Sequence, residues 1–438
     1  MNRLTEMFPE IYRYGAQGTG KVRLISGLAA SLALCAATGY AVSKTTGSWG
    51  SYLAVVSFMQ FNMLVFYGTV CTARSVTQER GERTWDFQRL TPLSSFNLAA
   101  GKLLGAPIFA WFLFACLLPA ALTVVLFSPA IYKVFLSRYA LGLSISLLSM
   151  AIGLLASSYD DTGGSGMGHL SGPLIGIAGL SALNASFRYS DSLSLLLANY
   201  IYFYGHRLGA ATSILFLVLS FLAFAAWAFL GARYRIGRDL LEKRRAWRLP
   251  VFLLFLAWYI AGFEDGSARS GVFPAEALIL PGLAAYIASF LSCERREYWR
   301  RWLAGESPSR RLDDTPAWIK SAATMLVISG VLFLSYGFGR IYLILPLFLL
   351  RDLMFLQWCR FSASRHPEMM ALAYLALAYA LPMIILVPAK LTAVLPALLP
   401  YADIGISAAA NLAGPLAQVL AIGYLLRGKI KGVLSDKN

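Results

Sequence analysis

Charged residues, histidine and cysteine are all scarce in this sequence. Only 14% of the 438 residues are Asp, Glu, Lys or Arg, and histidine occurs three times. The five cysteines lie singly, without a CxxC pair, so the sequence indicates neither a zinc site nor a disulfide framework. Asp160, Asp161 and His169 flank a glycine-rich loop and could bind a metal, but a flexible loop explains the same residues. We therefore expect no metal, no resident cofactor and no catalytic residues.

A complete nucleotide-binding motif is missing as well. Residues 15–21 match the pattern G-x-x-x-x-G-K, but a P-loop needs a Ser or Thr next, a strand before it and a helix after it. Val22 follows instead, and it opens the first apolar run. ATP hydrolysis connected with this chain would therefore come from another polypeptide. The same apolar run predicts a membrane helix and not a signal peptide.

Apolar residues dominate what is present. They make up 58% of the chain, and the mean hydropathy of +0.62 is typical of a polytopic membrane protein. The net charge of +16 comes from basic residues clustered between apolar runs, as the positive-inside rule predicts, so nucleic-acid binding is not expected. Apolar runs predict twelve spans, at residues 24–42, 51–71, 98–127, 136–157, 170–187, 209–231, 249–263, 273–292, 321–338, 341–358, 369–387 and 403–426.

These spans form two halves with the same layout, residues 1–235 and 236–438. In each half the longest polar loop follows the second span, and a short apolar piece, 192–204 or 391–399, precedes the sixth. Each piece is too short to cross a hydrocarbon layer of about 30 Å, so we expect interfacial or re-entrant helices there. Residues 1–21 predict one further interfacial helix. The expected fold class is all-α, with about twelve transmembrane helices in two degenerate six-helix halves.

Charge also predicts the orientation in the membrane. With the N-terminus inside and twelve spans alternating, Lys and Arg are roughly fourfold more frequent on the inner segments than on the outer ones. This arrangement places both termini, both long loops and the basic joint at residues 233–248 in the cytosol. We expect a multi-pass protein of the cytoplasmic (inner) membrane of a prokaryote.

A short polar island, residues 78–95, separates the second and third apolar runs. Thr84 can cap a helix of two turns or less by accepting a bond from a backbone N–H. Trp85, Gln88 and Arg89 would share one side of this helix. The proline that follows disfavours helix and ends the segment, and a serine after it can cap the next membrane helix. The island therefore predicts a small charged helix that a soluble partner could grip.

The island resembles the coupling segment of the ABC-2 type transporter permeases. That segment has an E-R-x-x-G-T-like start, a T-P-L-S turn and a G-K pair that opens the next membrane helix. The matching residues are Glu79, Arg80, Thr84, Thr91, Pro92, Leu93, Ser94, Gly101 and Lys102. Arg83 departs from the pattern, because the family usually has glycine before the threonine. The six-span layout extends the resemblance to roughly the first half of the chain.

The resemblance implies that the work is divided between subunits. Family members dock the segment into a cytosolic ATPase, which binds ATP and Mg, and they export their substrates. This chain would be the transmembrane subunit, partnered by two ATPase copies and the lipid bilayer, and would not be an enzyme itself. The first-loop residues expected to couple it to the ATPase are Glu79, Arg80, Glu82, Arg83, Thr84, Trp85, Arg89, Pro92 and Lys102.

The corresponding loop of the second half is longer and more basic. A helix over residues 295–303 could dock by charge through Trp299 and Arg300. Gly305 and Pro308 follow it without a short, firm return to the membrane. We therefore expect the two loops to differ: the first transmits motion, and the second adds an attraction that salt screens.

A charged pair, Arg351 and Asp352, lies midway through the tenth apolar run. Charges at that depth are costly and usually mark a pathway or an internal pair. Two interpretations stay open at this point. The pair could contact a transported proton or substrate, or it could bond another helix for structural reasons.

Two other function classes compete with the transporter subunit. A secondary, ion-coupled transporter of six-plus-six architecture fits the layout, but residues 72–97 lack the major-facilitator signature and membrane carboxylates are few. A membrane enzyme would need acid, base or metal groups gathered at one membrane face, and none are gathered in the sequence. The function expected is therefore the membrane part of an ATP-driven exporter.

Overall fold

The computed structural model of the chain is built almost wholly from helices. Within the described residues, one two-stranded hairpin is the only sheet, and eight helical stretches are long and apolar enough to cross a membrane by length and composition. The prediction of a helical, polytopic membrane protein is thus confirmed, while the count of twelve spans stays a prediction. The structure describes residues 20–45, 47–90, 93–159, 168–191, 201–242, 247–263, 276–292, 296–303, 313–336, 341–362, 367–390, 394–400 and 408–435.

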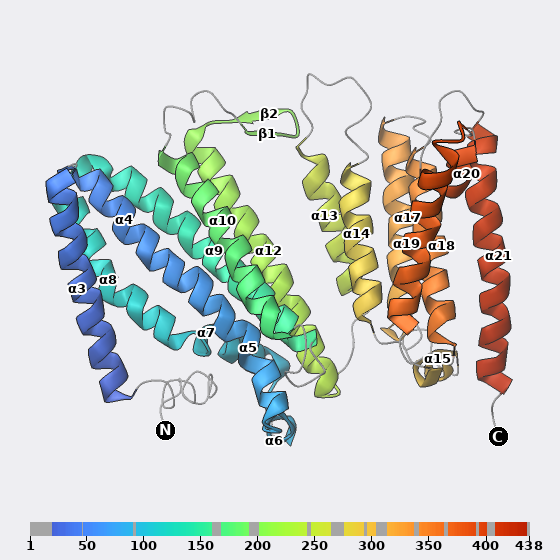
Figure 1. Ribbon diagram of the computed structural model, residues 1–438, viewed down its shortest axis with the longest axis horizontal. Coiled ribbons are helices and arrows are strands. Elements are labelled where there is room, and N and C mark those ends of the chain that lie inside the picture. Colours follow the sequence, from blue (N-terminus) through green and yellow to red (C-terminus); the bar gives the residue numbers. More distant parts are fainter. Residues whose placement is uncertain are drawn as a thin grey trace. The chain divides into compact units, whose positions relative to one another are not determined.

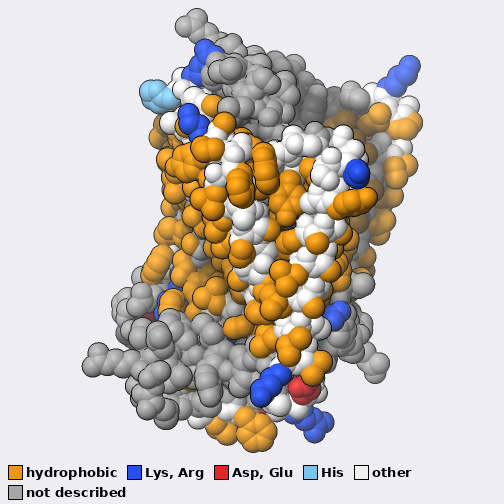
Figure 2. All heavy atoms as spheres, turned by 90° about the vertical axis from the view of Figure 1, so that its left-hand side faces the viewer, with side chains coloured by type: hydrophobic (Ala, Val, Ile, Leu, Met, Phe, Trp, Pro, Cys, Tyr) orange, Lys and Arg blue, Asp and Glu red, His pale blue; other side chains and the backbone are white. Residues whose placement is uncertain are grey.

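The surface is the kind that lipid chains cover. Leu32, Leu334 and Leu420 are each more than half exposed, although they lie within long apolar helices. Figure 2 shows a face whose middle is covered by hydrophobic side chains, while Lys and Arg side chains lie toward its two ends. Apolar surface of this extent is stable against hydrocarbon and not against water.

The chain packs as two units, which are described separately. Unit 1 comprises Met1–Ile201 and Leu208–Lys243, and unit 2 comprises Tyr202–Arg207 and Arg244–Asn438. The helices of unit 1 are long and lie side by side, and the short helix α6 lies beyond their lower ends in Figure 1. They are α3 (Lys21–Thr45), α4 (Trp49–Asn62), the π-helix η1 (Met63–Tyr67), α5 (Gly68–Gly81), α6 (Trp85–Leu90), α7 (Ser95–Gly105), α8 (Ile108–Phe127), the 3-10 helix η2 (Pro129–Ile131), α9 (Tyr132–Tyr159), α10 (Gly168–Asp191) and α12 (Ala210–Asp239).

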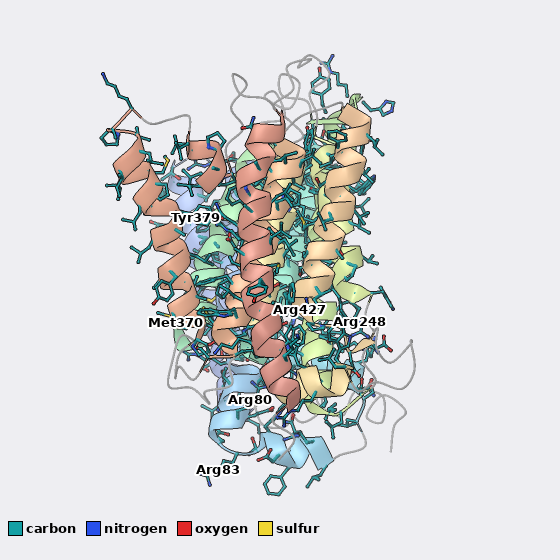
Figure 3. All side chains as sticks on the ribbon, turned by 90° about the vertical axis from the view of Figure 1, so that its right-hand side faces the viewer. Arg80, Arg83, Arg248, Met370, Tyr379 and Arg427 are labelled. Carbon is teal, nitrogen blue, oxygen red and sulfur yellow. The ribbon has the colours of Figure 1, made fainter. Side chains whose placement is uncertain are left out.

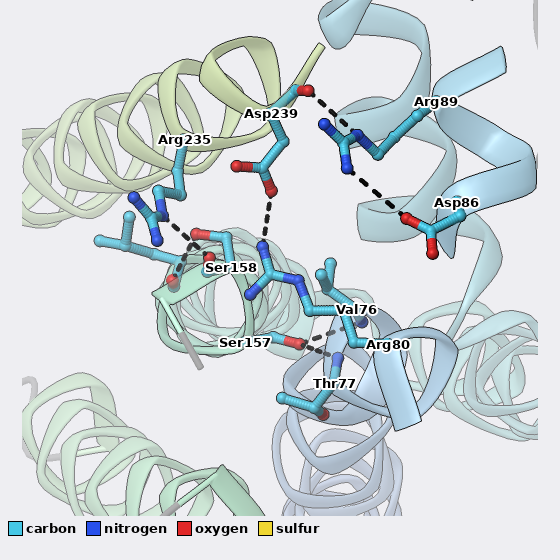
Figure 4. A network of polar contacts seen from close by, with 10 residues as sticks. Val76, Thr77, Arg80, Asp86, Arg89, Ser157, Ser158, Arg235 and Asp239 are labelled. Atoms are coloured by element: carbon cyan, nitrogen blue, oxygen red, sulfur yellow. Dashed lines mark hydrogen bonds and ion pairs between the residues drawn. The ribbon is translucent and has the colours of Figure 1, made fainter. Parts of the chain in front are cut away.

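The second predicted span is much longer than its apolar run. α4, η1 and α5 form one continuous helix that continues past residue 71 to Gly81. Residues 72–81 stay helical because some of their polar groups form hydrogen bonds with other residues of unit 1. The Ser157 hydroxyl on α9 accepts bonds from the backbone N–H groups of Val76 and Thr77, at 3.0 and 3.2 Å (Figure 4). The start of the polar island, residues 78–81, is therefore the end of a long helix and not a loop.

The third predicted span, residues 98–127, is two helices. α7 ends at Gly105 and α8 begins at Ile108. Pro107 lies between them, and proline has no N–H to continue the helical ladder. Ser94 caps α7 as the sequence predicts, because its hydroxyl accepts a bond from the backbone N–H of Asn97 at 3.3 Å.

Unit 2 packs around the inward faces of α14, α17 and α18, where Trp299, Trp318 and Leu353 belong to one buried cluster. The short helix α20 lies against α21 so closely that a Cβ at Gly414 would come within 2.5 Å of the Ala397 Cα. α13 and α14 are shorter than the other apolar helices of this unit. The elements are α13 (Arg248–Ala261), α14 (Glu276–Leu291), α15 (Arg296–Leu303), α17 (Ala317–Tyr336), α18 (Ile341–Arg360), α19 (Pro367–Leu386), α20 (Leu395–Leu398) and α21 (Ala408–Ser435).

The apolar piece before α12 differs from the prediction of a helix. Its described end forms a hairpin of strands β1 (Ile201–Phe203) and β2 (His206–Leu208). Tyr204 and Gly205 both have positive φ, +50° and +72°, which is the backbone of a type I′ turn. The Tyr204 hydroxyl then donates to the Trp258 carbonyl on α13 at 2.7 Å. Aromatic and β-branched residues favour strand here, and the glycine supplies the turn.

Other predictions lie outside the described residues. They concern the interfacial helix before Lys21, the carboxylate pair after α9, the turn at Thr91 and Pro92, and the end of the second loop at Gly305 and Pro308. The second short apolar piece is described from Val394 onward, and it contains the short helix α20.

Candidate functional site

The polar island gathers at one end of unit 1, where α5 turns into α6. α5 ends in a Schellman motif: the N–H of Thr84 bonds the Glu79 carbonyl at 2.9 Å, and the N–H of Arg83 bonds the Arg80 carbonyl at 3.2 Å. Arg83 holds the left-handed position of this motif, with φ of +58°. Glycine is the residue that this position favours, and glycine is also what the ABC-2 permease pattern has there.

Thr84 plays a different part from the predicted helix cap. Its hydroxyl donates to the Glu79 carbonyl at 3.3 Å, so it closes α5 and does not accept a bond from α6. The prediction of an N-cap was wrong because the Schellman turn brings the Glu79 carbonyl, which also accepts the Thr84 N–H, within reach of this hydroxyl. The short helix itself, Trp85–Leu90, is confirmed.

The inward side of α6 is anchored by an aromatic ring. Trp85 is only 5% exposed and packs with Val76, Leu98 and Ile236. The Lys102 Nζ and the Arg80 guanidinium lie over its ring, 5.4 and 5.6 Å from the centroid. Cations at this distance are attracted to the face of an indole ring. α6 is therefore held to the unit on one side.

A buried ion pair lies directly behind this ring. The Lys102 Nζ of α7 contacts the Glu79 carboxylate of α5, and the lysine side chain is fully buried. The pair joins the last turn of α5 to the last turn of the short helix α7. Since each charge would be costly alone at this depth, the two hold α5 and α7 in register.

The end of α12 completes the site. The Arg80 guanidinium contacts the Asp239 carboxylate at 2.6 Å, and the Arg89 Nε donates to the Asp239 carbonyl at 3.2 Å (Figure 4). Arg89 also pairs with Asp86 at 3.5 Å within α6. Both α5 and α6 are thus tied to the last turn of α12, which lies more than 140 residues later in the chain.

Glu242, just after α12, binds the beginning of α7. Its carboxylate accepts the backbone N–H of Ser95 at 2.7 Å and the Ser95 hydroxyl at 2.6 Å. A carboxylate at a helix N-terminus accepts a bond from a backbone N–H that has no partner within the helix. It also interacts favourably with the positive end of the helix dipole. We call the residues Glu79, Arg80, Trp85, Lys102, Asp239 and Glu242 the α6 anchor.

The outward side of α6 is apolar, which the sequence reasoning missed. Phe87 is 73% exposed and Leu90 is 84% exposed, while Trp85 and Gln88 on the other side are buried. The signal was present as two large apolar residues at i, i+3 within a polar stretch. Glu82, Arg83 and Asp86 are exposed beside them, and Figure 3 shows Arg83 extending from the lower end of the unit. Together these residues form a small amphipathic surface.

The predicted second loop is built differently. α15 is a helix as expected, but Trp299 is 2% exposed and lies in the core of unit 2. Its ring stacks on Trp318 with centroids 6.2 Å apart and meets Phe361 edge-on at 5.5 Å. Arg300 of the same helix is exposed. Trp299 thus faces inward, whereas Arg300 is exposed.

The charged pair of α18 is an internal one. Arg351 and Asp352 are 6% and 1% exposed and contact each other at 2.6 Å. The Asp352 carboxylate accepts bonds from the hydroxyls of Tyr286 on α14 and Tyr379 on α19. Arg351 also donates to Gln418 of α21 at 2.6 Å. The pair therefore joins four helices of unit 2. This is the geometry expected if its role is to bond neighbouring helices.

Comparison of the chain with protein-family models, with curated proteins and with solved structures finds no match. The functional interpretation therefore depends on the geometry of the α6 anchor and on the motif within it.

Proposed function

We propose that this chain is the transmembrane subunit of an ATP-binding cassette exporter of the ABC-2 type. In this proposal α6 is the coupling helix, and a separate cytosolic ATPase grips its outward side. The chain itself performs no chemistry. Two ATPase copies supply ATP binding and hydrolysis with Mg.

One observation carries the proposal: α6 is exposed on one side and rigidly anchored on the other. Phe87 and Leu90 offer apolar contacts of the kind that are worth about 1.5–3 kcal/mol each when buried in a partner. α6 itself contacts three helices: the Trp85 ring lies beneath Arg80 of α5 and Lys102 of α7, and Arg89 donates to the Asp239 carbonyl of α12. A force applied to α6 would therefore reach α5, α7 and α12.

The mechanism is mechanical. Closure of the ATPase dimer on ATP moves α6, and the anchor passes this motion to α5, α7 and α12. The bundle then exchanges one packing for another, so that nucleotide binding biases which side of the membrane the translocation pathway faces. The π-helical turn η1 lies in the helix that leads to the anchor, and such turns often accompany functional motion.

The experiment is capture of the partner. The tagged chain is purified from its native membrane in mild detergent, and co-purifying proteins are identified by mass spectrometry. We expect a soluble protein with Walker A and B motifs. Phe87→Ser combined with Leu90→Ser should lower its recovery at least tenfold, which corresponds to a loss of about 1.4 kcal/mol.

Leu241→Ser is the matched control, because Leu241 is 87% exposed but lies outside α6. This variant should recover the ATPase like the unmodified chain. Failure of the unmodified chain to bring down any ATPase, or ATP hydrolysis by the isolated chain, would contradict the proposal.

A secondary transporter is the second candidate, and the buried carboxylate of Asp352 favours it. Intramembrane carboxylates surrounded by hydroxyl groups serve as ion or proton sites in such proteins. Solute uptake or release by reconstituted vesicles under an ion gradient, without ATP or ATPase, would support this candidate over the first.

A further inference from the structure

The helix ends of unit 2 near α15 contain a group of buried polar atoms without partners. Among the described residues, six side chains there have an N or O atom that makes no hydrogen bond. Every one of these side chains is less than 9% exposed, so bulk water does not reach them. They are Ser289 (Oγ), Trp299 (Nε1), Trp318 (Nε1), Ser321 (Oγ), Gln357 (Nε2 and Oε1) and Arg360 (Nη1).

Contacts and helical spacing link these side chains across α14, α15, α17 and α18. Trp299 of α15 stacks on Trp318 of α17 and contacts Phe361, the residue after Arg360. Arg360 donates through its Nη2 to the carbonyls of Ser289 and Phe290 on α14, at 2.9 and 3.0 Å. Ser321 and Gln357 each lie one helical turn from a member of this set and so share its face. Four elements thus contribute to one buried polar region.

Hydrogen-bond donors outnumber acceptors among the unpaired atoms of this region. Both indole N–H groups, the amide Nε2 of Gln357 and the Nη1 of Arg360 can only donate, whereas the Gln357 Oε1 is the one atom that can only accept. The two serine hydroxyls can do either. Arg360 adds a buried positive charge, which Glu368 opposes only in part, at 3.4 Å and with a side chain 41% exposed.

Leaving these donors unsatisfied would be expensive, since each costs about 1–3 kcal/mol. A cluster of waters would bring as many donors as acceptors, so it suits a region with an excess of donors poorly. An oxyanion brings acceptors alone and interacts strongly with a guanidinium group. The basic helix α15, with Arg300 exposed, also lies at this end and attracts anions toward it.

We propose that unit 2 binds a phosphate-bearing anion between α14, α15, α17 and α18. The Arg360 Nη1, the Gln357 amide, the two serine hydroxyls and the two indole N–H groups donate to its oxygens. The phosphate belongs either to the headgroup of an anionic phospholipid or to a free ion. This site is independent of the α6 anchor and of the function proposed for it.

The test uses the whole chain in nanodiscs and measures its thermal unfolding midpoint. One arm adds inorganic phosphate to phosphatidylcholine discs, against chloride at equal ionic strength. The other compares discs containing phosphatidylglycerol with discs of phosphatidylcholine alone. We expect a rise of about 3 °C or more in at least one arm. A rise with phosphatidylglycerol only identifies a lipid headgroup, and a rise with phosphate identifies a site open to free ions.

The variants Trp318→Phe and Gln357→Leu decide whether the orphan donors cause the shift. Trp318→Phe keeps an aromatic ring for stacking but removes the N–H donor and part of the ring volume, so the rise is measured from this variant's own basal midpoint. Both variants should lose at least half of the rise, whereas Arg427→Gln, which removes an exposed charge from α21, should keep it. If neither probe raises the midpoint, or if both variants keep the full rise, the proposal is overturned. A higher basal midpoint of Gln357→Leu without any ligand effect would show a group that is simply unsatisfied.

Discussion

Arg83 occupies a backbone position that costs an L-amino acid about 1–2 kcal/mol. Its φ of +58° is fixed by the Schellman bonds at the end of α5, and its side chain is exposed. Leu241 holds the equivalent position after α12, with φ of +57°. Two of the helices that meet in the α6 anchor therefore end in the same strained turn.

Replacing Arg83 by glycine should stabilise the protein by about 1 kcal/mol, because glycine adopts this backbone without strain. The measurement is the thermal unfolding midpoint in detergent, with an expected rise of about 2–4 °C. Arg83→Ala is the control, since it removes the charge and keeps the strain. Equal midpoints for the alanine and glycine variants would show that charge, and not backbone conformation, dominates at this position.

The buried pair of Glu79 and Lys102 makes an opposite prediction. Removing one partner leaves an uncompensated charge, so Glu79→Leu should destabilise the protein by about 3–5 kcal/mol. The double variant Glu79→Leu with Lys102→Met replaces both charges by apolar groups and should recover most of this loss. Chemical denaturation of the three proteins gives the comparison. A double variant no more stable than the single one would mean that the pair's bonds themselves stabilise this end of unit 1.

Much of the α6 anchor was visible in the sequence, because Glu79, Arg80 and Trp85 lie within one short motif. Asp239 and Glu242 were not, since nothing local marks a residue that pairs across 147 or more positions. A single sequence reports neighbours along the chain, whereas the anchor is made by the return of α12. The i, i+3 spacing of Phe87 and Leu90 was visible in the sequence, but their exposure depends on which side of α6 packs against the unit, and tertiary contacts decide that.

Helices in unit 1 are joined at their ends by specific side chains rather than by loops alone. Glu242 is the clearest case, since it caps α7 from the segment after α12. The loss of such a cap costs about 1 kcal/mol and acts mainly on the first turn of the helix.

Glu242→Ala should therefore make the backbone amides at the start of α7 exchange faster with solvent, by roughly fivefold if about 1 kcal/mol is lost. Hydrogen-exchange mass spectrometry of peptides covering residues 93–100 measures this. Glu82→Ala is the matched control, because Glu82 is exposed and bonds only Gln78 within the described contacts. Equal protection in the two variants would show that Ser94 alone suffices to cap α7.

Helices were predicted best where an apolar run was also long enough to cross a membrane. Apolar runs located α3, α9 and α12 to within a few residues or one to two turns. The predicted end of the second span was wrong because tertiary contacts stabilise helix in polar sequence. α5 extends beyond the apolar run because Ser157 and Lys102 bond its polar groups. The prediction was also wrong at the hairpin, where the turn at Tyr204 and Gly205 decides between strand and helix.

At the scale of the whole molecule, the two units do not share a site. Unit 1 exposes the apolar side of its short helix, whereas unit 2 buries Trp299 in its core. The expectation that the two loops differ agrees with this burial. The sequence suggested a repeat because apolar runs and loop lengths recur, and those features say little about which side chains face inward. Whether all twelve runs span the membrane stays a prediction, since α13 and α14 are short.

The orientation of the whole chain can be argued from the contacts and then tested. Arg80 binds Asp239, so the α6 end and the end of α12 lie on the same side of the membrane. α12 has 30 residues and a length of about 45 Å, more than the roughly 30 Å of hydrocarbon, so the hairpin before it lies on the opposite side. From the positive-inside rule we predict that the α6 end faces the cytosol.

In a cysteine-free variant of the chain, single cysteines at Glu82, His206 and Lys429 report these positions, because all three residues are exposed. A membrane-impermeant thiol reagent added to intact cells should label only His206→Cys. In inverted vesicles it should label Glu82→Cys and Lys429→Cys, and all three should react after permeabilisation, which controls for reactivity. We predict that Lys429 lies on the same side as Glu82. The end of α18, which Arg360 fastens to the end of α14, would be followed by two crossings, one by α19 and one by α21. Labelling of Lys429→Cys from outside, with Glu82→Cys protected, would mean that the two units have opposite orientations and that the repeat inferred from the sequence is inverted.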